Sequence, residues 1–445
     1  MKKEDEILEK EIKSFVEEFM TKLDNREAYI VSHFDTDGIT SASIMIQTLK
    51  RLDKKFSLRV VKSLNEQFIS EIPKDKIILF LDLASGSLDH IKNANLENVF
   101  IIDHHEITQP IPENVRIINP HLINKQKISG SGLTYLCCKQ INTDIKELSK
   151  LAILGMIGDC LEKEIDSLNN GILEESGVQR KRGLLIYPST RPINRVLEYS
   201  SNPYIPEVTG NIKGVLELLR ETGLTPEKGK YKSLMELNEQ EMKGLTTAIL
   251  LRNPKIKNKD LVGDIFLIKM FNKIEDARDL SAIINACSRS GKPELAIQYC
   301  LEIPSSKRDV ELTHIKYKQN IITGLNFVSE TEKIEGRGFV IINAQDNIKD
   351  TMIGTIASII SNSAIYEEGT IVVTMAYYED KIKVSTRLVG RTGRNLREML
   401  EAITNLTGGE IGGHEHAAGC IINRSKERDF IDLLKKNLEI EMIKI

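Results

Sequence analysis

The chain has 445 residues, of which 41% are hydrophobic and 28% are charged, and its formal net charge is -3 at pH 7. This length exceeds one ordinary hydrophobic core, so we expect two or three globular domains. The small negative charge excludes a wholly basic nucleic-acid binder, although a local groove can be positive without changing the total.

The N-terminal segment is rich in Lys and Glu and predicts an amphipathic helix. Its apolar residues recur at helical spacing: Leu8, Ile12, Phe15, Val16, Phe19 and Leu23. The segment lacks the apolar core of a signal peptide, and no apolar run approaches the roughly 20 residues of a membrane span. The six cysteines form no CxxC pair, which is typical of a reducing compartment. We therefore expect a cytoplasmic protein that does not bind a membrane.

Short β-branched runs separated by helical segments follow, and this alternation predicts a parallel α/β domain. The runs occupy residues 28–32, 58–61, 77–81 and 99–102. Ligands of such sheets collect at the carboxyl ends of the strands, and Asp35, Asp82 and Asp103 follow three of these runs closely. A predicted helical pair, at 131–141 and 145–157, then leads to Gly158-Asp159. We expect these acidic residues to converge in space.

The first of these motifs runs from His33 to Gly38. Strand geometry is expected to direct His33, Asp35 and Asp37 to one side and the residues between them to the other, while Gly38 permits a sharp turn into the next helix. An alternative is that an aspartate here is an ordinary helix N-cap beside a chance histidine.

The two following motifs differ in specificity. Asp82 by itself is also compatible with the cap of a helix that begins near Ser85. Asp103-His104-His105 is more specific, because two adjacent imidazoles beside a carboxylate have no packing rationale. Carboxylates with a few imidazoles favour Mn²⁺ or Mg²⁺, and we expect two Mn²⁺ ions, with Mg²⁺ as the alternative. A two-metal site of this kind suits hydrolysis of phosphoesters.

The rest of the chain divides at a Pro- and Gly-containing stretch, residues 200–210, which predicts a boundary. We place the first domain at residues 1–205, a mainly helical connecting or inserted region at 206–335, and a smaller second α/β domain at 336–445. The second domain is predicted from strands at 339–343, 370–376 and 381–386 and a helix at 396–404. The architecture expected is therefore α/β and two-lobed.

A glycine-rich segment, residues 412–419, lies near the end of the chain. Its small residues allow close approach of the backbone to a ligand, and at a helix start they would expose N–H groups to an anion, so the segment predicts a phosphate site. A tight turn with a small-residue packing face is the alternative. Arg180-Lys181-Arg182 is a basic stretch that either follows a nucleic-acid backbone or forms a solvated face.

The motifs together resemble those of the DHH phosphoesterase superfamily, which is named for the tripeptide at Asp103 to His105. The resemblance implies one metal ion held by His33, Asp35 and Asp82, and a second held by Asp37, Asp82, His104 and Asp159. It also implies that Asp103 orients His104, that His105 meets the scissile phosphate or the leaving oxygen, and that Asp82 is catalytic as the shared ligand.

The glycine-rich segment resembles the substrate-binding signature of the DHHA1 domain, which accompanies the DHH domain in nucleases and small-nucleotide phosphodiesterases. The implied substrate-binding residues are Arg387, Gly412, Gly413, His414, His416, Ala418 and Gly419. Arg391 and Arg394 lie close to Arg387 in the sequence and are further candidates, since guanidinium groups suit phosphate oxygens.

Residues 200–206 and 284–292 are similar to archaeal RecJ-like nucleases. This similarity implies a metal-dependent exonuclease that hydrolyses single-stranded DNA or RNA in replication or repair, with the GINS replication complex as a possible partner. An oligoribonuclease or small-nucleotide phosphodiesterase is the first alternative, and chain-length dependence of cleavage separates the two. A replisome scaffold associated with GINS is the second, and the intact motifs argue against a purely non-catalytic role.

Overall fold

A computed structural model describes residues 3–123, 127–142, 144–200, 203–254, 256, 258–363 and 365–440. Residues 201 and 202 of the predicted boundary lie outside the described residues, as do the two ends of the chain. The chain forms two compact units, the first from Met1–Arg182 and Asp264–His314, and the second from Gly183–Gly263 and Ile315–Ile445.

A parallel five-stranded sheet in the order β2-β1-β3-β4-β5 is the centre of the first unit. Its strands are β1 (Ala28–His33), β2 (Phe56–Val61), β3 (Ile77–Leu81), β4 (Val99–Ile102) and β5 (Val115–Ile118). The predicted parallel α/β class and its four strands are confirmed. The sequence reasoning missed β5, an edge strand of only four residues with an Arg in it, too short and too polar to stand out as an apolar run.

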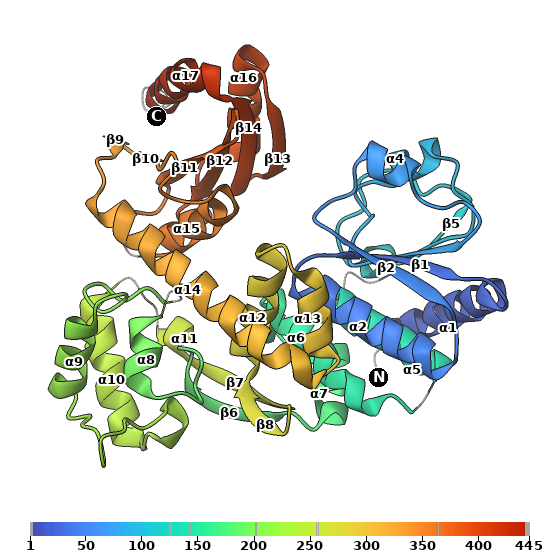
Figure 1. The fold of residues 1–445 in the computed structure, drawn as a ribbon, viewed down its shortest axis with the longest axis horizontal. Helices are drawn as coiled ribbons and strands as arrows, with labels where there is room; N and C mark the ends of the chain where they lie inside the picture. The colour runs from blue at the N-terminus through green and yellow to red at the C-terminus, as the bar shows by residue number, and fades with distance from the viewer. Residues whose placement is uncertain are drawn as a thin grey trace. The chain divides into compact units, whose positions relative to one another are not determined.

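Helices cover both faces of this sheet (Figure 1). One face packs against α1 (Lys3–Leu23), α2 (Thr36–Arg51), α5 (Gly130–Ile141) and α6 (Ser149–Gly158), and the other against α3 (Glu66–Ser70) and α4 (Leu88–Asn93). The amphipathic first helix is confirmed, because all its predicted apolar residues are buried. Phe15 and Phe19 pack edge-on against Phe100, with ring centroids 5.4 and 5.2 Å away.

The chain later returns to the first unit with a second helical layer. Among its helices, α12 contacts α2 and α6, and α13 contacts α2. The returning helical elements are α12 (Ala277–Arg289), α13 (Pro293–Cys300), η5 (Pro304–Ser306) and the first part of α14 (Lys307–Glu330). Earlier in the chain, the first unit also contains α7 (Ser167–Ser176) and the short 3-10 helices η1 (Pro120–Leu122), η2 (Lys146–Leu148) and η3 (Leu161–Lys163). The predicted helix at 145–157 is therefore two elements, η2 and α6.

The region between the two sheet domains is mainly helical, as predicted, but it also contains strands. A three-stranded sheet in the order β6-β7-β8 joins β6 (Gln179–Leu184), β7 (Val262–Met270) and β8 (Lys273–Asp276). The helices α8 (Ile193–Glu198), α9 (Ile212–Glu221), α10 (Glu239–Arg252) and α11 (Asn258–Leu261), with η4 (Leu234–Glu236), belong to the second unit. They surround an apolar core of their own, which includes Val196, Leu218 and Leu245.

A six-stranded mixed sheet in the order β13-β14-β12-β11-β10-β9 forms the remainder of the second unit (Figure 1). Its elements are β9 (Ile334–Gly336), β10 (Phe339–Asn343), α15 (Asp350–Asn362), β11 (Ile371–Tyr378), β12 (Lys381–Leu388), α16 (Leu396–Thr407), β13 (Glu410–His414), β14 (Ala417–Asn423), η6 (Arg424–Lys426) and α17 (Glu427–Ile440). Helices α16 and α17 cover one face and α14 and α15 the other. The second α/β domain is thus confirmed, while the glycine-rich segment is a β-hairpin and not a helix start.

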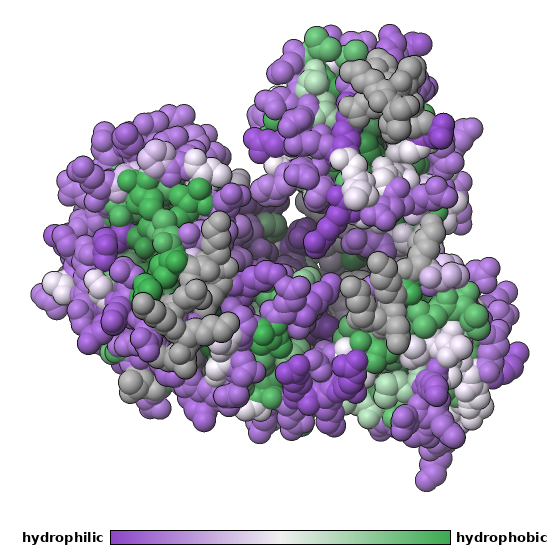
Figure 2. Space-filling view, turned by 180° about the vertical axis from the view of Figure 1, so that it is seen from behind, coloured by the Kyte–Doolittle hydropathy of each residue, from purple (hydrophilic) through white to green (hydrophobic). Residues whose placement is uncertain are grey.

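No helix among the described residues combines the length and the apolarity needed to cross a membrane. The face of the molecule in Figure 2 is mostly hydrophilic, and its apolar residues gather in separate patches. Large exposed apolar side chains include Leu122, Leu251 and Leu406.

Candidate metal centre

The first motif brings three side chains to the carboxyl end of β1 by three different local structures. His33 is the last strand residue, Asp35 is the N-cap of α2, and Asp37 lies in the first turn of α2. Asp35 does cap the helix, since its Oδ1 accepts a hydrogen bond from the Gly38 N–H at 3.0 Å, but its Oδ2 also lies 3.0 Å from His33 Nδ1 within the cluster. Gly38 is required for a different reason from the one predicted: a Cβ there would lie 2.2 Å from the carbonyl oxygen of His33.

Of the two residues between these three, Thr36 is directed away from the cluster, as predicted, whereas the ring of Phe34 packs edge-on against the His33 ring, with centroids 5.1 Å apart. The Thr36 hydroxyl donates to the carbonyl of Ser281 at 3.0 Å, which ties α2 to α12. The ring of Phe34 lies 5.8 Å from the guanidinium of Arg289 at the end of α12. Sequence reasoning did not single out Arg289, and this cation beside the motif is a further candidate for contact with phosphate.

Asp82 lies in the loop after β3, almost completely buried, with a positive φ of 59°. A non-glycine residue in this region costs roughly 1–2 kcal/mol. Ala84, with φ 96°, adds a second such residue to the loop. Asp82 does not cap a helix, because α4 begins at Leu88 with Ser87 in the N-cap position. The loop therefore holds the Asp82 carboxylate in place at a cost in backbone strain.

Asp37 is fixed by the amino end of α5. Its carboxylate accepts hydrogen bonds from the Gly130 N–H at 2.6 Å and the Ser131 N–H at 2.9 Å, while the Ser129 hydroxyl caps the same helix. Ser129 is thus the N-cap of a helix whose amino end is directed at the site. A Cβ on Gly130 would lie 2.9 Å from Asp82 Oδ1, so glycine leaves room for two carboxylates at this point.

The imidazoles of His33 and His104 lie among the carboxylates. His33 Nδ1 is 3.0 Å from Asp35 Oδ2 and 3.5 Å from Asp82 Oδ2. His104 Nε2 is 3.2 Å from Asp82 Oδ1, 3.2 Å from Asp159 Oδ2 and 3.7 Å from Asp37 Oδ2. Donor atoms close enough to share an ion form three sets: His33, Asp35 and Asp82; Asp37, His104 and Asp159; and Asp82, His104 and His105. Asp82 belongs to two of these sets.

The cluster has the properties of a cation site. Both carboxylate oxygens of Asp82 and Oδ2 of Asp159 are buried without a hydrogen-bond donor among the described residues, and such orphaned acceptors are costly unless a cation is bound. Burial and the charge of Asp37 raise the pKa of Asp82 well above its usual range. Burial, Asp37 and Asp82 likewise raise the pKa of Asp159 to about 10. The oxygen-rich donor set with imidazoles fits Mn²⁺ or Mg²⁺.

The charge of His33 depends on the same carboxylates. Burial opposes its protonation, but Asp35 and Asp82 outweigh burial and raise the pKa of His33 to about 10. Burial would also raise the pKa of Asp35, yet the contact with His33 lowers it to about 2. Protons thus occupy part of the cluster at neutral pH, and a cation must displace them.

Asp103 contacts a different histidine from the one implied by the family resemblance. Its Oδ1 lies 2.7 Å from Nδ1 of His105 and accepts the backbone N–H groups of His104 and His105, while Oδ2 accepts the Ser85 N–H at 2.9 Å. Asp103 therefore orients the His105 ring and not the His104 ring, because the sharp turn after β4 brings the second imidazole back toward it. The bond raises the pKa of His105. The side chain of His105 is 54% exposed, which leaves its Nε2 accessible.

The glycine-rich hairpin of the second unit presents open backbone. Gly413 has a φ of 110°, and a Cβ there would lie 2.4 Å from the carbonyl oxygen of Ala417, so this glycine is required by the hairpin itself. A Cβ on Gly412, by contrast, would meet no atom within 4 Å, so the small size of this residue is not required by packing. His414 is exposed and His416 is partly buried, and Gly419 and buried Ala418 pair with β12.

Arg387 lies on β12, next to this hairpin in the same sheet. Its Nε donates to the Ser358 hydroxyl at 2.9 Å and Nη1 to the carbonyl of Thr386 at 2.8 Å. Arg394 is bound by Asn437 of α17, which favours a structural role, whereas Arg391 is exposed. Of the basic stretch, Arg180 pairs with Asp264, and Lys181 and Arg182 are exposed.

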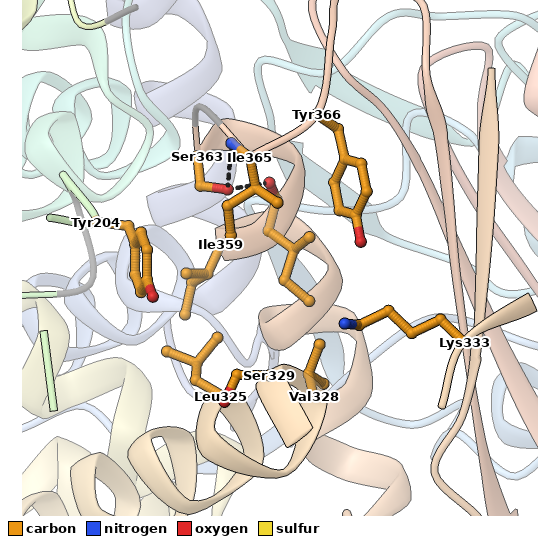
Figure 3. Close-up of a pocket in the computed structure, with 10 residues that line it drawn as sticks. Tyr204, Leu325, Val328, Ser329, Lys333, Ile359, Ser363, Ile365 and Tyr366 are labelled. Atoms are coloured by element: carbon orange, nitrogen blue, oxygen red, sulfur yellow. Dashed lines mark hydrogen bonds between the residues drawn. The ribbon is translucent and has the colours of Figure 1, made fainter. Parts of the chain in front are cut away.

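A separate pocket in the second unit contains none of the predicted site residues. It lies between α14 and α15 and is mostly apolar, lined by Leu325, Val328 and Ile359, among others. Figure 3 shows Lys333 with its amino group directed toward this pocket and Tyr204 on another wall. The chemistry predicted from the sequence lies elsewhere, in the metal centre and the glycine-rich hairpin.

Family models match the segments that carry the candidate metal centre and the glycine-rich hairpin. The DHH family, N-terminal domain, matches residues 27–158, the DHH-CID domain matches residues 186–259, and the DHHA1 domain matches residues 337–439. The fold and site thus define a protein with a DHH-type metal centre and a DHHA1 domain. The chain belongs to the DHH/DHHA1 superfamily. Its fold is similar to that of RecJ.

One curated protein and several solved structures match nearly the whole chain. An uncharacterized protein of Methanocaldococcus jannaschii is 30% identical over 450 residues, which cover 95% of this chain and 96% of that protein. The fold is similar to that of exonuclease RecJ bound to manganese, with a TM-score of 0.62, 15% identity and coverage of 96% of this chain and 94% of that one. CDC45 from Entamoeba histolytica has a TM-score of 0.68, 11% identity and coverage of 96% and 99%.

Proposed function

We propose that this protein is a divalent-metal-dependent exonuclease that hydrolyses phosphodiester bonds of single-stranded DNA or RNA, in replication or repair. The observation that carries the proposal is the buried Asp82 carboxylate, whose two oxygens lack donors among the described residues and lie between two groups of further ligands. A protein that only scaffolds other proteins has no need for such a costly arrangement.

The two ions would have different sets of ligands that share Asp82. His33, Asp35 and Asp82 would hold one Mn²⁺ or Mg²⁺ ion, and Asp37, Asp82, His104 and Asp159 the other. Two such ions, when bound, lower the pKa of a water molecule and stabilise charge on the phosphoryl oxygens during in-line displacement. The amino end of α5 keeps the Asp37 carboxylate from rotating, since two backbone N–H groups bind its two oxygens.

His105 acts at the leaving oxygen. Asp103 occupies Nδ1 of the ring, so Nε2 is the nitrogen that faces the substrate and gives its proton to the oxygen of the departing nucleotide. Asp103 also stabilises the imidazolium before this transfer. On the substrate side, Arg387, His414, His416 and the backbone at Gly412, Gly413, Ala418 and Gly419 bind phosphate groups.

The length of the connecting region, residues 206–335, favours a polymer substrate, and the composition of the chain favours recognition of the substrate's backbone. The chain has no Trp, and only 5% of its residues are aromatic, which limits extensive stacking on bases. Recognition therefore rests on the phosphate backbone and a strand end, and we expect little sequence preference.

The test is a Mn²⁺-supplemented time course on end-labelled single-stranded DNA and RNA of graded lengths, with Asp82→Ala as the inactive control. Progressive shortening of long strands supports the exonuclease and reports its polarity and sugar preference. Activity confined to the shortest oligomers or to nucleotides would replace it by an oligoribonuclease or small-nucleotide phosphodiesterase. Absence of any metal-dependent hydrolysis would leave the scaffold function.

A second role is association with the GINS replication complex, which the resemblance to archaeal RecJ-like nucleases implies. The chain also matches the DHH-CID domain and has a fold similar to that of CDC45. This association is compatible with catalysis, because the metal centre and the DHH-CID match occupy different segments of the chain. Co-purification from native extract at low salt tests it. Failure to retain GINS under these conditions would count against this partner.

A further inference from the structure

Asn119, at the end of β5, makes contacts that the metal centre itself does not explain. We propose that Asn119 is a positioning residue for hydrolysis, which fixes the loop that carries Asp103 and His105 so that Nε2 of His105 faces the leaving oxygen. The inference rests on the proposed function, and it adds a residue that touches neither the metal ligands nor the substrate.

The Asn119 side chain is completely buried, and each of its polar atoms has a partner. Nδ2 donates to the carbonyl oxygen of His105 at 2.8 Å and to the hydroxyl of Ser85 at 3.0 Å. Oδ1 accepts the backbone N–H of His121 at 2.9 Å. Because one partner is a backbone N–H and another a backbone carbonyl, the amide can adopt only this orientation. The bond to His121 thus fixes the Asn119 side chain, and the bond from Nδ2 restrains the backbone of His105.

These contacts close a ring of hydrogen bonds around the catalytic pair. From Asn119 the ring passes to Ser85, whose N–H donates to Asp103 Oδ2 at 2.9 Å. Asp103 Oδ1 then meets His105 Nδ1 at 2.7 Å, and the carbonyl of His105 returns to Asn119. Networks of this kind restrict each member more strongly than separate bonds do.

The ring joins the loops that follow three neighbouring strands. Ser85 follows β3, Asp103 and His105 follow β4, and Asn119 follows β5, and these strands are adjacent in the sheet. The side chain of His105 is half exposed, and its ring centroid lies 4.6 Å from that of His104 and 6.5 Å from that of His33. The hydrogen bond from Asn119 to the His105 carbonyl therefore restrains the backbone of His105, and the bond to Asp103 restrains its imidazole ring.

Asparagine is suited to this position by its chemistry. The site needs two N–H donors for two oxygen atoms and one acceptor for a backbone N–H, on a side chain short enough to remain buried. Aspartate has nearly the same shape, but when ionised it cannot donate to the His105 carbonyl. Alanine leaves the carbonyl of His105 and the N–H of His121 without partners.

The full-length Asn119→Ala variant tests the inference on two substrates with different leaving groups. A single-stranded oligonucleotide has an alkoxide leaving group that needs a proton, whereas bis(4-nitrophenyl) phosphate loses a stable phenolate without one. If Asn119 positions His105, kcat on the oligonucleotide falls about 10- to 100-fold. KM, kcat on the aryl ester and the thermal stabilisation by Mn²⁺ remain close to wild type, because the metal ligands are intact.

Asn253→Ala is the matched control, since Asn253 is also buried and donates to a backbone carbonyl, that of Tyr204, in the second unit. It should lower both activities equally or leave both unchanged. Asn119→Asp, which preserves the shape, gives the same contrast between substrates if Asn119→Ala does not fold. Equal losses on the two substrates, or no loss on either, would overturn the inference. A wild-type protein that hydrolyses neither substrate would instead overturn the proposed function, and this inference with it.

Discussion

Replacing Asp82 by Asn should make the metal-free protein more stable while removing most of its stabilisation by Mn²⁺. The Asp82 side chain is 1% exposed, its oxygens lack donors among the described residues, and the carboxylates of Asp35, Asp37 and Asp159 belong to the same cluster. An amide of the same shape removes one acid from this cluster and adds an N–H that can donate to a neighbouring carboxylate.

The expected size follows from linkage and from the cost of an unpartnered buried group. Relief of that cost should raise the free energy of unfolding of the metal-free protein by at least about 1 kcal/mol. For the wild type, a cation at about one hundred times its Kd adds about 2.7 kcal/mol. That addition corresponds to roughly 5–10 °C in Tm for a unit of this size. Without the shared ligand Asp82, the variant should show less than about a third of that shift.

Thermal melts with and without Mn²⁺, together with the exonuclease time course, measure both effects on one preparation. Asn253→Ala, which changes a buried polar residue of the second unit, controls for non-specific destabilisation. Retention of the full Mn²⁺ shift, with hydrolysis above about one per cent of wild type, would refute the bridging role of Asp82. A metal-free variant less stable than the wild type would refute the argument from buried charge.

Three further predictions concern pH and the glycine-rich hairpin. The Mn²⁺-induced rise in Tm should increase from about pH 6 to about pH 8. The pKa values of Asp159 and His33 are both raised to about 10, so bound protons compete with the ion and are released more easily as pH rises. A Mn²⁺-induced rise in Tm that is constant with pH would contradict this. Gly413→Ala should lower the free energy of unfolding by about 1–3 kcal/mol, because Gly413 has a positive φ and a Cβ there would meet the Ala417 carbonyl. Gly412→Ala should leave Tm unchanged and raise KM, because a Cβ there would meet no atom. Equal losses of stability for the two variants, measured by chemical denaturation and by melting, would refute the distinction. His414→Ala should raise KM with little change in kcat, and steady-state kinetics that show only a loss of kcat at saturating substrate would assign it a catalytic role instead.

The sequence alone was sufficient for four of the five strands of the first sheet and for β10, β11, β12 and α16 of the second domain. Strands buried on both faces appear as continuous apolar runs, as in residues 77–81, and this signal does not depend on distant contacts. The edge strand β5 has no such signal, because a short edge strand is held by its neighbour more than by its own apolar residues. The glycine-rich segment was assigned to a helix start for a similar reason: backbone freedom indicates close approach, but not whether a hairpin or a helix provides it.

The identity of the metal-centre residues was also predictable, since aspartates and histidines directly after parallel strands must gather at one edge of the sheet. The hydrogen-bond partners of these residues were not predictable from the sequence. Whether Asp103 contacts His104 or His105 depends on how the chain turns after β4, and the role of Asn119 depends on three loops meeting, which no local pattern encodes. Local chemistry thus determined which residues form the site, while the packing of distant segments decided which atoms face one another, because hydrogen-bond geometry is set by the whole fold and not by position along the chain.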